Sequence, residues 1–598
     1  MLILGLTDGI TCGAAIVSDG IVLAAVNEER LSRIKMAYGF PRQSITEVMR
    51  IAGVTPGEID RVASATVNNH FYDGLRPFDG WLERDKGVIR NTVFGAAGRF
   101  GYLVDTVPGV ESLYYGLRRP IFAARRRAIR HILARELGLT APVEFIDHHL
   151  AHAASAYFTS GFDDALVVTE DGGGDGSSGH VYNVSDGAFE RVGYTSAFNS
   201  LGNYYSYVTH LCGFKAQKHE GKITGLAAHG EPRYKELLDS RITLHNGSIH
   251  NVGRKVFLGA IEDLEKRLPE GWTHADLAAS IQRHSEDLAL GYVEGFLDPT
   301  APRDLALAGG LFANVRINQK LFELPGVKRI FVHPGMTDGG LPVGAALAIS
   351  IRNREGPVAP ASRQVIGDVY YGPEYSGRQI EAELTGSGLA YTRPEDLELE
   401  VARLLAEGRV VARFDGRMEY GPRALGNRSI LYHPGDRSVN DWLNQSLGRT
   451  EFMPFAPATP IEETERFYLQ TEGARDTARF MTITFDCSPW MNEHCGGVIH
   501  VDGTARPQLV DRTVAPSYHR LITEFGRLTG ISTVINTSFN MHEEPIVCSP
   551  HDAVRAFLLG HLDYLAIGSF LVPSPKPIER DLTWLEAATS ASDGAMRS

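Results

Sequence analysis

Cysteine is scarce in this chain of 598 residues, and its few cysteines follow no pairing pattern. They are odd in number, and no two of them stand in a Cys-x-x-Cys spacing. Such usage argues against a disulfide framework and is typical of a reducing compartment. We therefore expect a cytoplasmic protein with free thiols at Cys12, Cys212, Cys487, Cys495 and Cys548.

The chain also lacks a basic excess, a leader segment and a long apolar run. Its formal net charge is −13 at pH 7, whereas a nucleic-acid partner would require a basic face. Residues 1–5 are predicted to begin directly as a strand without a basic leader, so no signal peptide is expected. The most apolar long window, residues 553–572, is interrupted by Arg555, His561 and Asp563. It therefore favours a buried helix followed by a strand over a membrane span.

The chain has the length and composition of a globular enzyme with two large domains. Its 598 residues exceed what one core holds, and 43% hydrophobic with 22% charged residues is ordinary for such an enzyme. One basic stretch, residues 118–135, alternates arginines with apolar residues. It predicts an amphipathic helix with a solvated face, and leaves open a phosphate-collecting or membrane-surface role.

Candidate chemistry concentrates in residues 147–176. A helix that begins near Asp147 places His148 and His152 on one face, where the two imidazoles can grip a metal. A pair with this spacing also arises by chance on many helices. The apolar, β-branched run that follows predicts a buried strand leading to Asp171. A carboxylate at that place, beside two histidines, favours the metal interpretation.

The theme of strand, glycine-rich loop and carboxylate recurs at residues 331–340, where the carboxylate is Asp338. Asp338 is the natural fourth ligand of a shell with two histidines and two carboxylates. Such a shell leaves room for substrate oxygens and suits iron(II), manganese or zinc better than a closed structural site does. Gly172 and Gly173 let backbone N–H groups approach a phosphate, so metal and nucleotide are expected together.

A strand that ends at an Asp-Gly pair and passes into a hairpin occurs twice, first from residue 2 and again from residue 165. This repeat predicts a duplicated α/β domain over residues 1–356, with nucleotide phosphates between the two hairpin turns. Residues 68–139, rich in aromatics and arginine, are an insertion in this pattern. They form either a lid or acceptor-binding layer, or simply extra helices.

Further positions suited to a nucleotide lie in the second half of this domain. The polar-to-glycine segment 218–227 is predicted to be a ligand loop, and a double glycine ends a buried strand further on. Two asparagines at helical spacing come within reach of a ribose or base, although a surface helix explains them equally well. The candidates are Lys222, Gly309, Gly310, Asn314 and Asn318.

A linker rich in proline, glycine and alanine precedes a second domain, residues 366–572. Residues 414–429 place three arginines among glycine and proline turns, and Arg449 follows. Residues 536–540 offer a hydroxyl and an amide on one face of an extended chain. Arginines held near one another are costly unless anions neutralise them, and phosphates are the expected anions. The chain end, residues 573–598, is expected to fray.

Five long motifs are specific enough to identify a family: HHLAHAASAY, EDGGGDG, GRMEYGPRALGNRSI, RTEFMPFAPA and NTSFNMHEEPIV. With them the chain resembles the O-carbamoyltransferases of the NodU/CmcH type over nearly its whole length. The resemblance implies an N-terminal domain of the actin-like ATPase superfold (ASKHA) and a C-terminal YrdC-like domain. It implies that the C-terminal domain makes carbamoyl adenylate from carbamoyl phosphate and ATP with Mg²⁺. The N-terminal domain, with a bound metal that is usually iron(II), then passes the carbamoyl group to a hydroxyl of a small natural product, antibiotic or sugar.

The resemblance also implies site residues, carried over motif by motif. The metal ligands are those that the spacing indicates: His148, His152, Asp171 and Asp338. Adenylation builds negative charge on the transferring phosphates, which fixed guanidinium groups stabilise, so Arg423 and Arg449 are assigned catalytic roles. The complete nucleotide and carbamoyl phosphate shell implied for the second domain is Arg423, Arg428, Arg449, Arg506, Ser538 and Asn540.

This chain departs from the family pattern at two places. Many relatives carry His-Asp ahead of the first hairpin, where Ile10-Thr11 stand here, so the usual histidine beside the acceptor hydroxyl is missing. Asp8 is then the nearest candidate for the general base, although capping of an Asp-Gly turn explains it as well. Leu447 and Met453 stand where many relatives carry a lysine and a second arginine. Other candidates for the base are His210, His219 and His229.

Two other functions remain compatible with the sequence. An actin-fold small-molecule kinase would need ATP and an acceptor but no carbamoyl phosphate, and the arginine-rich second domain argues against it. A non-catalytic, nucleotide-dependent regulatory protein would leave the metal ligands without a use. The sequence does not identify the acceptor, and it leaves a homodimer open.

Overall fold

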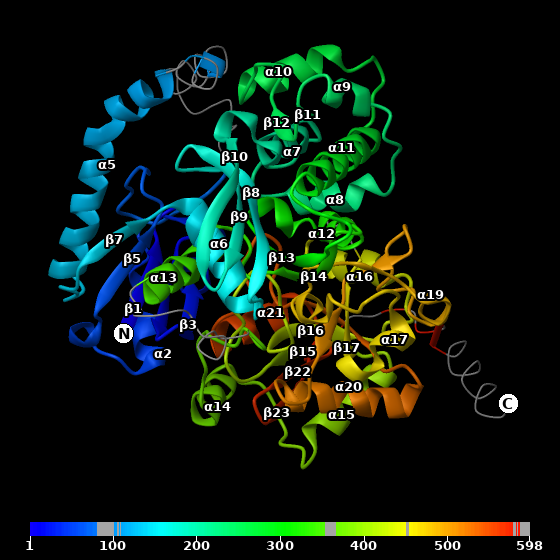
Figure 1. Cartoon of the computed structure of the whole chain (residues 1–598). Helices are drawn as coiled ribbons and strands as arrows, with labels where there is room; N and C mark the ends of the chain where they lie inside the picture. Colours follow the sequence, from blue (N-terminus) through cyan, green and yellow to red (C-terminus); the bar gives the residue numbers. More distant parts are fainter. Residues whose placement is uncertain are drawn as a thin grey trace. The chain divides into compact units, whose positions relative to one another are not determined.

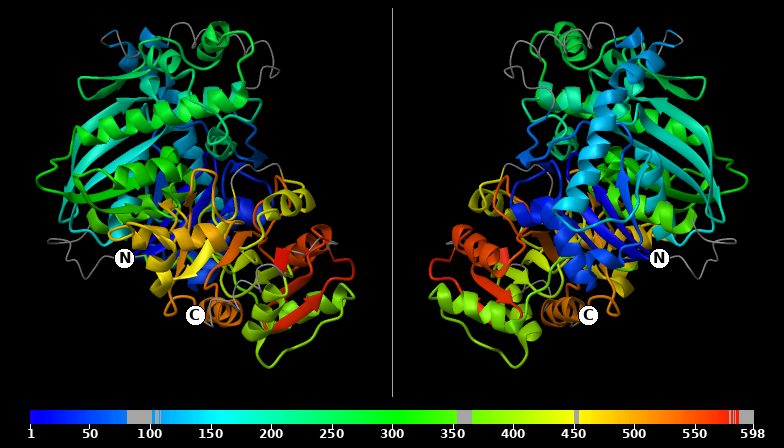
Figure 2. Two further views of the ribbon diagram at one scale, coloured as in Figure 1. Left: turned by 90° about the vertical axis from the view of Figure 1, so that its right-hand side faces the viewer. Right: turned by 90° about the vertical axis from the view of Figure 1, so that its left-hand side faces the viewer.

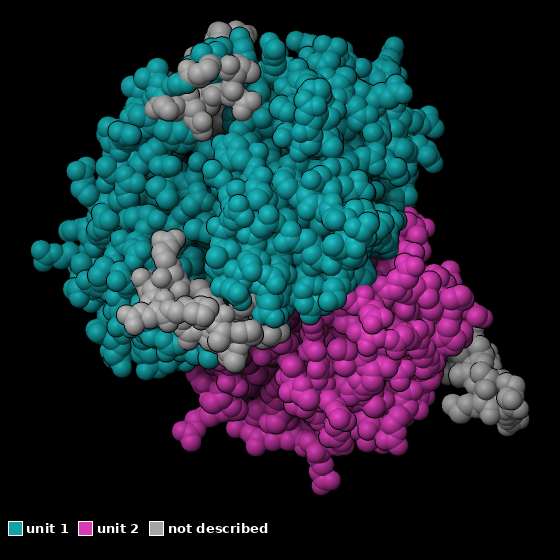
Figure 3. All heavy atoms as spheres, in the orientation of Figure 1, with its two compact units in different colours: residues 1–29, 36–366 teal, residues 30–35, 367–598 magenta. Residues whose placement is uncertain are grey.

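The structure is a computed structural model of the chain. It describes residues 1–80, 101–103, 107, 109–352, 366–449, 454–577, 580, 582 and 584–585. The chain divides into two compact units, which are coloured separately in Figure 3. The first unit comprises residues 1–29 and 36–366, and the second comprises residues 30–35 and 367–598. The assignment of residues 30–35 to the second unit was not expected. The linker expected near residues 354–362 lies outside the described residues.

The first unit contains two five-stranded sheets of one design (Figures 1 and 2). The first sheet has the order β3-β2-β1-β5-β7, with antiparallel neighbours on one side of β1 and parallel neighbours on the other. Its strands are β1 (Leu2–Thr7), β2 (Gly13–Ser18), β3 (Ile21–Asn27), β5 (Arg61–Ala65) and β7 (Val143–Ile146).

The second sheet repeats this arrangement as β10-β9-β8-β13-β14, with the same strand directions. Its strands are β8 (Asp164–Gly174), β9 (Ser177–Ser185), β10 (Ala188–Ser196), β13 (Arg303–Ala308) and β14 (Val327–Val332). The hairpin strands β8, β9 and β10 are the long cyan arrows of Figure 2. The predicted duplication is thus confirmed, and the unit has the α/β, actin-like fold that the resemblance implies.

Two helices connect the halves of this unit. Helix α6 (His148–Ser160) packs on β8 and β13, whereas α13 (Leu341–Arg352) packs on β1, β2 and β5, and the two helices pack on each other. Their small residues permit a close approach. A Cβ at Gly344 of α13 would lie 1.8 Å from the carbonyl oxygen of Ala151 in α6. Because no side chain fits there, this glycine sets the distance between the helices.

The described part of the expected insertion contains the short strand β6 (Arg76–Pro77) and one long helix, α5 (Val110–Arg135), which lies along the outer edge of the unit in Figure 1. As predicted, the helix is amphipathic, with Ile129 and Leu133 buried. The expectation of a solvated arginine face is wrong at one position, because Arg125 has 0% exposure. Residues 81–100 of the insertion lie outside the described residues.

The segment 218–227 is not the predicted loop: most of it forms helix α8 (Glu220–Ala227). The other helices of the first unit are α2 (Arg42–Ala52), α7 (Leu201–Leu211), α9 (Lys235–Asp239), α10 (Leu258–Arg267), α11 (His274–Glu294) and α12 (Val315–Phe322). Short strands complete it as the pairs β4 (Ala37–Tyr38) with β6 (Arg76–Pro77) and β11 (Thr243–His245) with β12 (Ser248–His250).

The second unit is built on a seven-stranded mixed sheet with the order β20-β17-β21-β16-β15-β22-β23. Its strands are β15 (Val411–Phe414), β16 (Arg428–Tyr432), β17 (Ala456–Pro460), β20 (Gln508–Val510), β21 (Val534–Ser538), β22 (Tyr564–Ile567) and β23 (Phe570–Pro573). Its longer helices are α14 (Gly377–Gly386), α15 (Leu397–Ala406), α16 (Val439–Ser446), α20 (Pro516–Thr529) and α21 (Pro550–Leu559). This is the second α/β domain that the resemblance implies.

The apolar window 553–572 contains the predicted helix, α21, but two strands, β22 and β23, follow it where one was predicted. No helix among the described residues has both the length and the apolar character needed to span a membrane. All five cysteines are free and buried. The expectation of a frayed end is wrong for the described part of the tail, because Arg580 forms an ion pair with the buried Asp563 and Trp584 packs against Tyr432.

Candidate functional site

Helix α6 begins at the residue that the sequence indicated. The Asp147 side chain accepts a hydrogen bond from Leu150 N at 2.9 Å, which caps the helix, so its first turn carries His148 and its second carries His152. The rings of these histidines lie 4.8 Å apart, centroid to centroid, and both side chains are buried.

The structure brings the four predicted metal ligands together from three elements of the first unit. His148 and His152 come from α6, Asp171 from β8, and Asp338 from the turn that leads into α13. The Nε2 atoms of the two histidines lie 2.8 and 3.4 Å from Asp171 Oδ2, and 3.7 and 3.6 Å from Asp338 Oδ1. Ligand atoms bound to one ion at about 2.1 Å stand about 3.4 Å apart in a tetrahedral shell. The observed spacings bracket that value.

The donor set itself fits a divalent cation. Within the described residues, neither ring nitrogen of His152 has a hydrogen-bond partner, although both are buried. The same holds for Oδ1 of Asp171. Buried polar atoms of this kind are rare in folded proteins unless something binds them. Imidazole with carboxylate suits iron(II), manganese or zinc.

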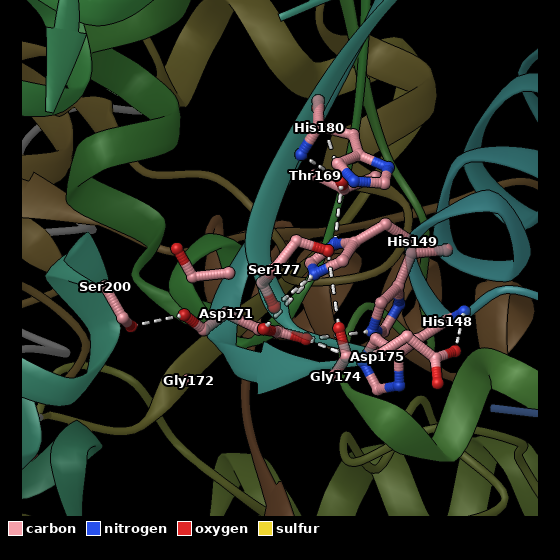
Figure 4. A network of polar contacts seen from close by, with 12 residues as sticks. His148, His149, Thr169, Asp171, Gly172, Gly174, Asp175, Ser177, His180 and Ser200 are labelled. Carbon is pink, nitrogen blue, oxygen red and sulfur yellow. Dashed lines mark hydrogen bonds and ion pairs between the residues drawn. The ribbon is translucent and has the colours of Figure 1, made fainter. Parts of the chain in front are cut away.

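His148 is oriented from two sides, of which Figure 4 shows the contact with Asp175. Its Nδ1 lies 3.0 Å from Thr66 Oγ1, and its backbone N donates to Asp175 Oδ2 at 2.9 Å. The ring therefore presents Nε2 to Asp171. His149 faces elsewhere, as predicted, because its nitrogens lie 3.0 Å from Thr169 Oγ1 and 3.0 Å from the carbonyl oxygen of Ser177.

The charges around the site favour a cation. Burial lowers the pKa of His148, but the adjacent Asp171 carboxylate, with Asp338 and Asp175, outweighs burial and raises it to about 10. His149, which lacks such a close carboxylate, is held neutral, because burial lowers its pKa to about 4. Two carboxylates therefore face the two ligand histidines, and a positive ion placed between them satisfies all four groups.

The glycines near Asp171 permit close packing around the site. A Cβ at Gly174 would lie 2.2 Å from the His148 ring, so only glycine leaves room for this ligand. Gly173 and Gly309 have φ of +140° and +110°, and a Cβ at Gly309 would lie 2.3 Å from the Glu170 carbonyl oxygen. Gly310 lies beside Asp171, and Gly172 contacts Asn203. Contact between these glycines and a nucleotide stays a prediction.

Asp8 does not face an open cleft as expected. It is fully buried, and Arg125 donates to both of its carboxylate oxygens, at 2.9 and 2.6 Å. Arg125 also donates to the carbonyl oxygens of Thr66, at 2.7 Å, and Ala65, at 3.1 Å. Because both carboxylate oxygens are engaged, Asp8 is placed to hold Arg125 rather than to take a proton from an acceptor. Sequence reasoning missed Arg125, which carries no local signal of burial.

The remaining nucleotide candidates of the first unit have structural contacts. Asn314 caps α12, where its Oδ1 accepts hydrogen bonds from the backbone N atoms of residues 316 and 317, and its Nδ2 donates to Gln282. Asn318 is buried and donates to the Phe312 carbonyl oxygen at 2.7 Å. Lys222 is buried on α8, with its Nζ 5.7 Å from the ring centre of Phe214. Both asparagines are buried, so the surface-helix alternative is wrong, and their contact with a nucleotide stays a prediction.

In the second unit, Arg423 and Arg506 lie near each other. Burial, together with the neighbouring Arg423 charge, holds the pKa of Arg506 well below its usual value. No hydrogen-bond partner for Arg506 Nε occurs among the described residues. Asn536 donates to the Ala424 carbonyl oxygen, next to Arg423. This concentration of buried positive charge suits an anion.

The loop that carries Arg423 is held by Glu419, which sequence reasoning missed. Its Oε1 accepts hydrogen bonds from Leu425 N at 2.9 Å, Asn427 N at 2.7 Å and Arg428 N at 3.0 Å, and the side chain is buried. A buried carboxylate that accepts three backbone N–H bonds fixes the course of a loop.

Arg428 itself is part of the scaffold of that loop. Its guanidinium is fully buried 3.7 Å above the Phe414 ring and donates to the carbonyl oxygens of Asp415, at 2.6 Å, and Gly416, at 3.1 Å. Direct contact with a phosphate, as the resemblance implies, therefore does not fit this placement, because carbonyl groups already occupy the guanidinium.

The structure joins the other three predicted residues of this shell. Arg449 Nη2 donates to the carbonyl oxygens of Ser538, at 2.6 Å, and Asn540, at 2.7 Å, and reaches Asn540 Oδ1 at 3.0 Å. Asn540 in turn donates to the carbonyl oxygens of Met541 and Glu544, which forms a turn after β21. Residues 450–453, next to Arg449, lie outside the described residues.

Comparison with known proteins places the chain in a family. The family model for the carbamoyltransferase N-terminus matches residues 3–347, and that for the carbamoyltransferase C-terminus matches residues 402–574. Nodulation protein NolNO of Sinorhizobium fredii is 33% identical over 575 residues, which cover 94% of this chain and 78% of that protein. Nodulation protein NolO of Bradyrhizobium diazoefficiens is 35% identical over 436 residues, covering 71% and 78%. These matches show that the chain belongs to the carbamoyltransferase family.

Proposed function

We propose that the protein is an ATP-dependent O-carbamoyltransferase in which each unit performs one half-reaction. The second unit forms carbamoyl adenylate from carbamoyl phosphate and ATP. The first unit, with a bound divalent cation, transfers the carbamoyl group to a hydroxyl of a small natural product or sugar. The observation that carries the proposal is the contrast between the sites, a histidine and carboxylate cluster in one unit and paired arginines in the other.

The first half-reaction calls for positive charge. Carbamoyl phosphate loses its phosphate to water, and an oxygen of the resulting carbamate attacks the α-phosphorus of ATP and displaces pyrophosphate. Each step adds negative charge to phosphate oxygens, which fixed guanidinium groups stabilise without reorganisation. We assign this role to Arg423, on a loop held by Glu419, and to Arg506, on the segment before β20.

The second half-reaction forms a bond between the acceptor oxygen and the carbamoyl carbon, while AMP leaves and the hydroxyl proton departs. The two histidines and two carboxylates would hold a divalent cation, which would supply Lewis acidity to the reacting carbonyl. Thr66 and Asp175 orient His148 toward Asp171, and the lack of a side chain at Gly174 leaves room for the His148 ring. Asp8 has no part in this step, since both of its oxygens bind Arg125.

One assay separates this proposal from its rivals. The protein is incubated with ATP, Mg²⁺, carbamoyl phosphate and a set of hydroxyl acceptors, and the nucleotide products are identified. A carbamoyltransferase of this kind releases AMP and pyrophosphate only when carbamoyl phosphate is present. A small-molecule kinase releases ADP without it. No turnover across a broad acceptor set favours the regulatory interpretation.

A further inference from the structure

Residues 30–35 form a short loop of the N-terminal sequence that belongs to the second unit. The flanking residues are joined by a hydrogen bond from Met36 N to Glu29 Oε2 at 2.8 Å, so the loop is closed at its base. It begins on helix α1 (Glu28–Ser32), and Arg33 has a φ of +60°, which is strained for a residue with a Cβ. Strained backbone of this kind persists where the surroundings hold it and occurs often at functional sites.

The loop contacts the chain on both sides of Arg423 in the sequence. Arg30 is 5% exposed, and its Nη2 donates to the carbonyl oxygen of Gly421 at 2.8 Å. Leu31 packs against a buried cluster formed by Met418, Ala424, Ile546 and Cys548. Gly421 and Ala424 flank Arg423 in the sequence, so these contacts bear on the loop that positions its guanidinium.

The loop also contacts residues 545–552, which follow Asn540 in the sequence. Arg33 donates from Nη1 to the Ile546 carbonyl oxygen and from Nη2 to the Pro545 carbonyl oxygen, each at 2.7 Å. Its Nε lies 3.4 Å from Asp552 Oδ1. This stretch is tied back to the site by a hydrogen bond from Val547 N to the Phe539 carbonyl oxygen at 2.9 Å.

Guanidinium groups that donate to carbonyl oxygens fix the course of a chain. Apolar side chains would bury this surface without fixing the direction of the chain. The planar guanidinium of arginine, in contrast, donates only to acceptors in defined positions. Each arginine grips a different segment, and each segment borders one part of the second site. The loop therefore sets the separation of Arg423 from Ser538 and Asn540.

We propose that Arg30 and Arg33 are positioning residues for the site of the second unit. They hold residues 421–424 and 545–548 at the spacing that carbamoyl phosphate and ATP require. This inference rests on the proposed function, and it means that the adenylate-forming site is completed by residues from the beginning of the chain.

The test uses the full-length chain and the variants Arg30→Lys and Arg33→Gly. Lysine keeps the charge of Arg30 but not its fork, and glycine removes the Arg33 side chain at a φ that glycine adopts freely. Pyrophosphate release is expected to fall about 10–100-fold in kcat/KM, because displacement of a binding loop by about 1 Å costs that much. Metal stoichiometry and transfer from supplied carbamoyl adenylate are expected to stay at the wild-type level. Arg50→Lys, at an exposed arginine of α2, is the control.

Hydrogen exchange gives a second readout that does not need turnover. Peptides covering residues 418–424 and 541–548 are expected to exchange faster in both variants than in the wild type, while peptides of β16 and β21 do not change. Wild-type pyrophosphate release together with unchanged exchange in these peptides overturns the inference. Parallel loss of metal binding and of transfer also overturns it, since that indicates general unfolding. A wild type that releases no pyrophosphate contradicts the proposed function instead, and the exchange data then decide on the loop.

Discussion

Arg125 and Asp8 form a two-point ion pair in which neither side chain is exposed to solvent. Arg125 belongs to the long helix α5, whereas Asp8 follows the first strand of the chain. Through the Thr66 carbonyl oxygen, Arg125 also holds the residue whose hydroxyl contacts the metal-ligand candidate His148. The pair therefore bears on both the stability of the first unit and the geometry of its site.

Replacing Asp8 by asparagine is expected to destabilise the first unit strongly. An unpaired buried guanidinium costs about 3–5 kcal/mol, so the midpoint of its thermal unfolding should fall by several degrees. The double variant Asp8→Asn with Arg125→Met should recover much of this loss, because the buried charge is gone. Glu144→Gln, in the partly exposed pair with Arg61, serves as the control and should have little effect. Normal stability together with a steep loss of transfer would restore Asp8 as the base.

His152→Ala is expected to abolish stoichiometric binding of the divalent cation, because it removes one of the four donors. Metal content after reconstitution measures this directly. Pyrophosphate release should persist while carbamoyl transfer stops. His131→Ala, at an exposed position of α5, should bind metal normally. Equal metal content in the two variants would show that the cluster is not a metal site.

Thr66→Val is expected to weaken metal binding about 10–100-fold without loss of the fold, because it removes only the hydroxyl 3.0 Å from His148 Nδ1. Valine matches threonine in shape at this strained backbone position, where φ is +69°. Competition with a chelator of known affinity gives the ratio. Thr66→Ser keeps the hydroxyl and should restore the affinity. If the Thr66→Val and Thr66→Ser variants bound the metal with equal affinity, the hydroxyl would have no role in orienting the His148 ring.

Gly344→Ala tests whether the approach of two helices sets the metal geometry. The added Cβ would meet the Ala151 carbonyl oxygen at 1.8 Å, so α13 must move away from α6. We expect a cost of at least about 1–3 kcal/mol and weaker metal binding, since α13 follows Asp338. The control is Gly116→Ala in α5, where the added Cβ meets no atom within 4 Å. This variant should stabilise the protein slightly. If the Gly344→Ala variant bound the metal with unchanged affinity, the contact between α6 and α13 would not determine the metal geometry.

Arg506→Gln should stop adenylate formation and leave metal binding intact, because it removes one of the two clustered charges of the second unit. Pyrophosphate release is the measurement, and a loss of about 100-fold or more is expected for a group that stabilises transferring phosphates. Arg512→Gln, at an exposed position nearby in the sequence, is the control. Similar rates in both variants would exclude Arg506 from the site.

The four candidate metal ligands could be brought together from the sequence because each belongs to a local pattern. His148 and His152 share a helix face, and Asp171 and Asp338 follow apolar strands, so helix and strand periodicity sufficed. The role of Asn314 as a helix cap was also open to local reasoning, because asparagine before a helix is a strong capping signal. Sequence reasoning missed this role, because it placed Asn314 within the helix and not before it.

The failures concern residues whose partners are distant in the sequence. The sequence predicts a solvated Arg125, because Asp8, the carboxylate that pairs with it, is 117 residues away. Arg428 reads as a phosphate ligand because nothing in its neighbourhood shows that carbonyl groups surround it. Arg30 donates to a carbonyl 391 residues along the chain. Burial of a charge is decided by such tertiary contacts, which periodicity does not report.

The loop at residues 30–35 also constrains how the protein is made. It is synthesised hundreds of residues before Gly421, Pro545 and Ile546, whose carbonyl groups it contacts. The first unit can complete its core before then, because its sheets lie wholly within residues 2–332. Until residues 418–548 have been synthesised, Arg30 and Leu31 lack the partners that bury them. Contacts of such long sequence separation form slowly, so this docking is expected to be a late step of folding.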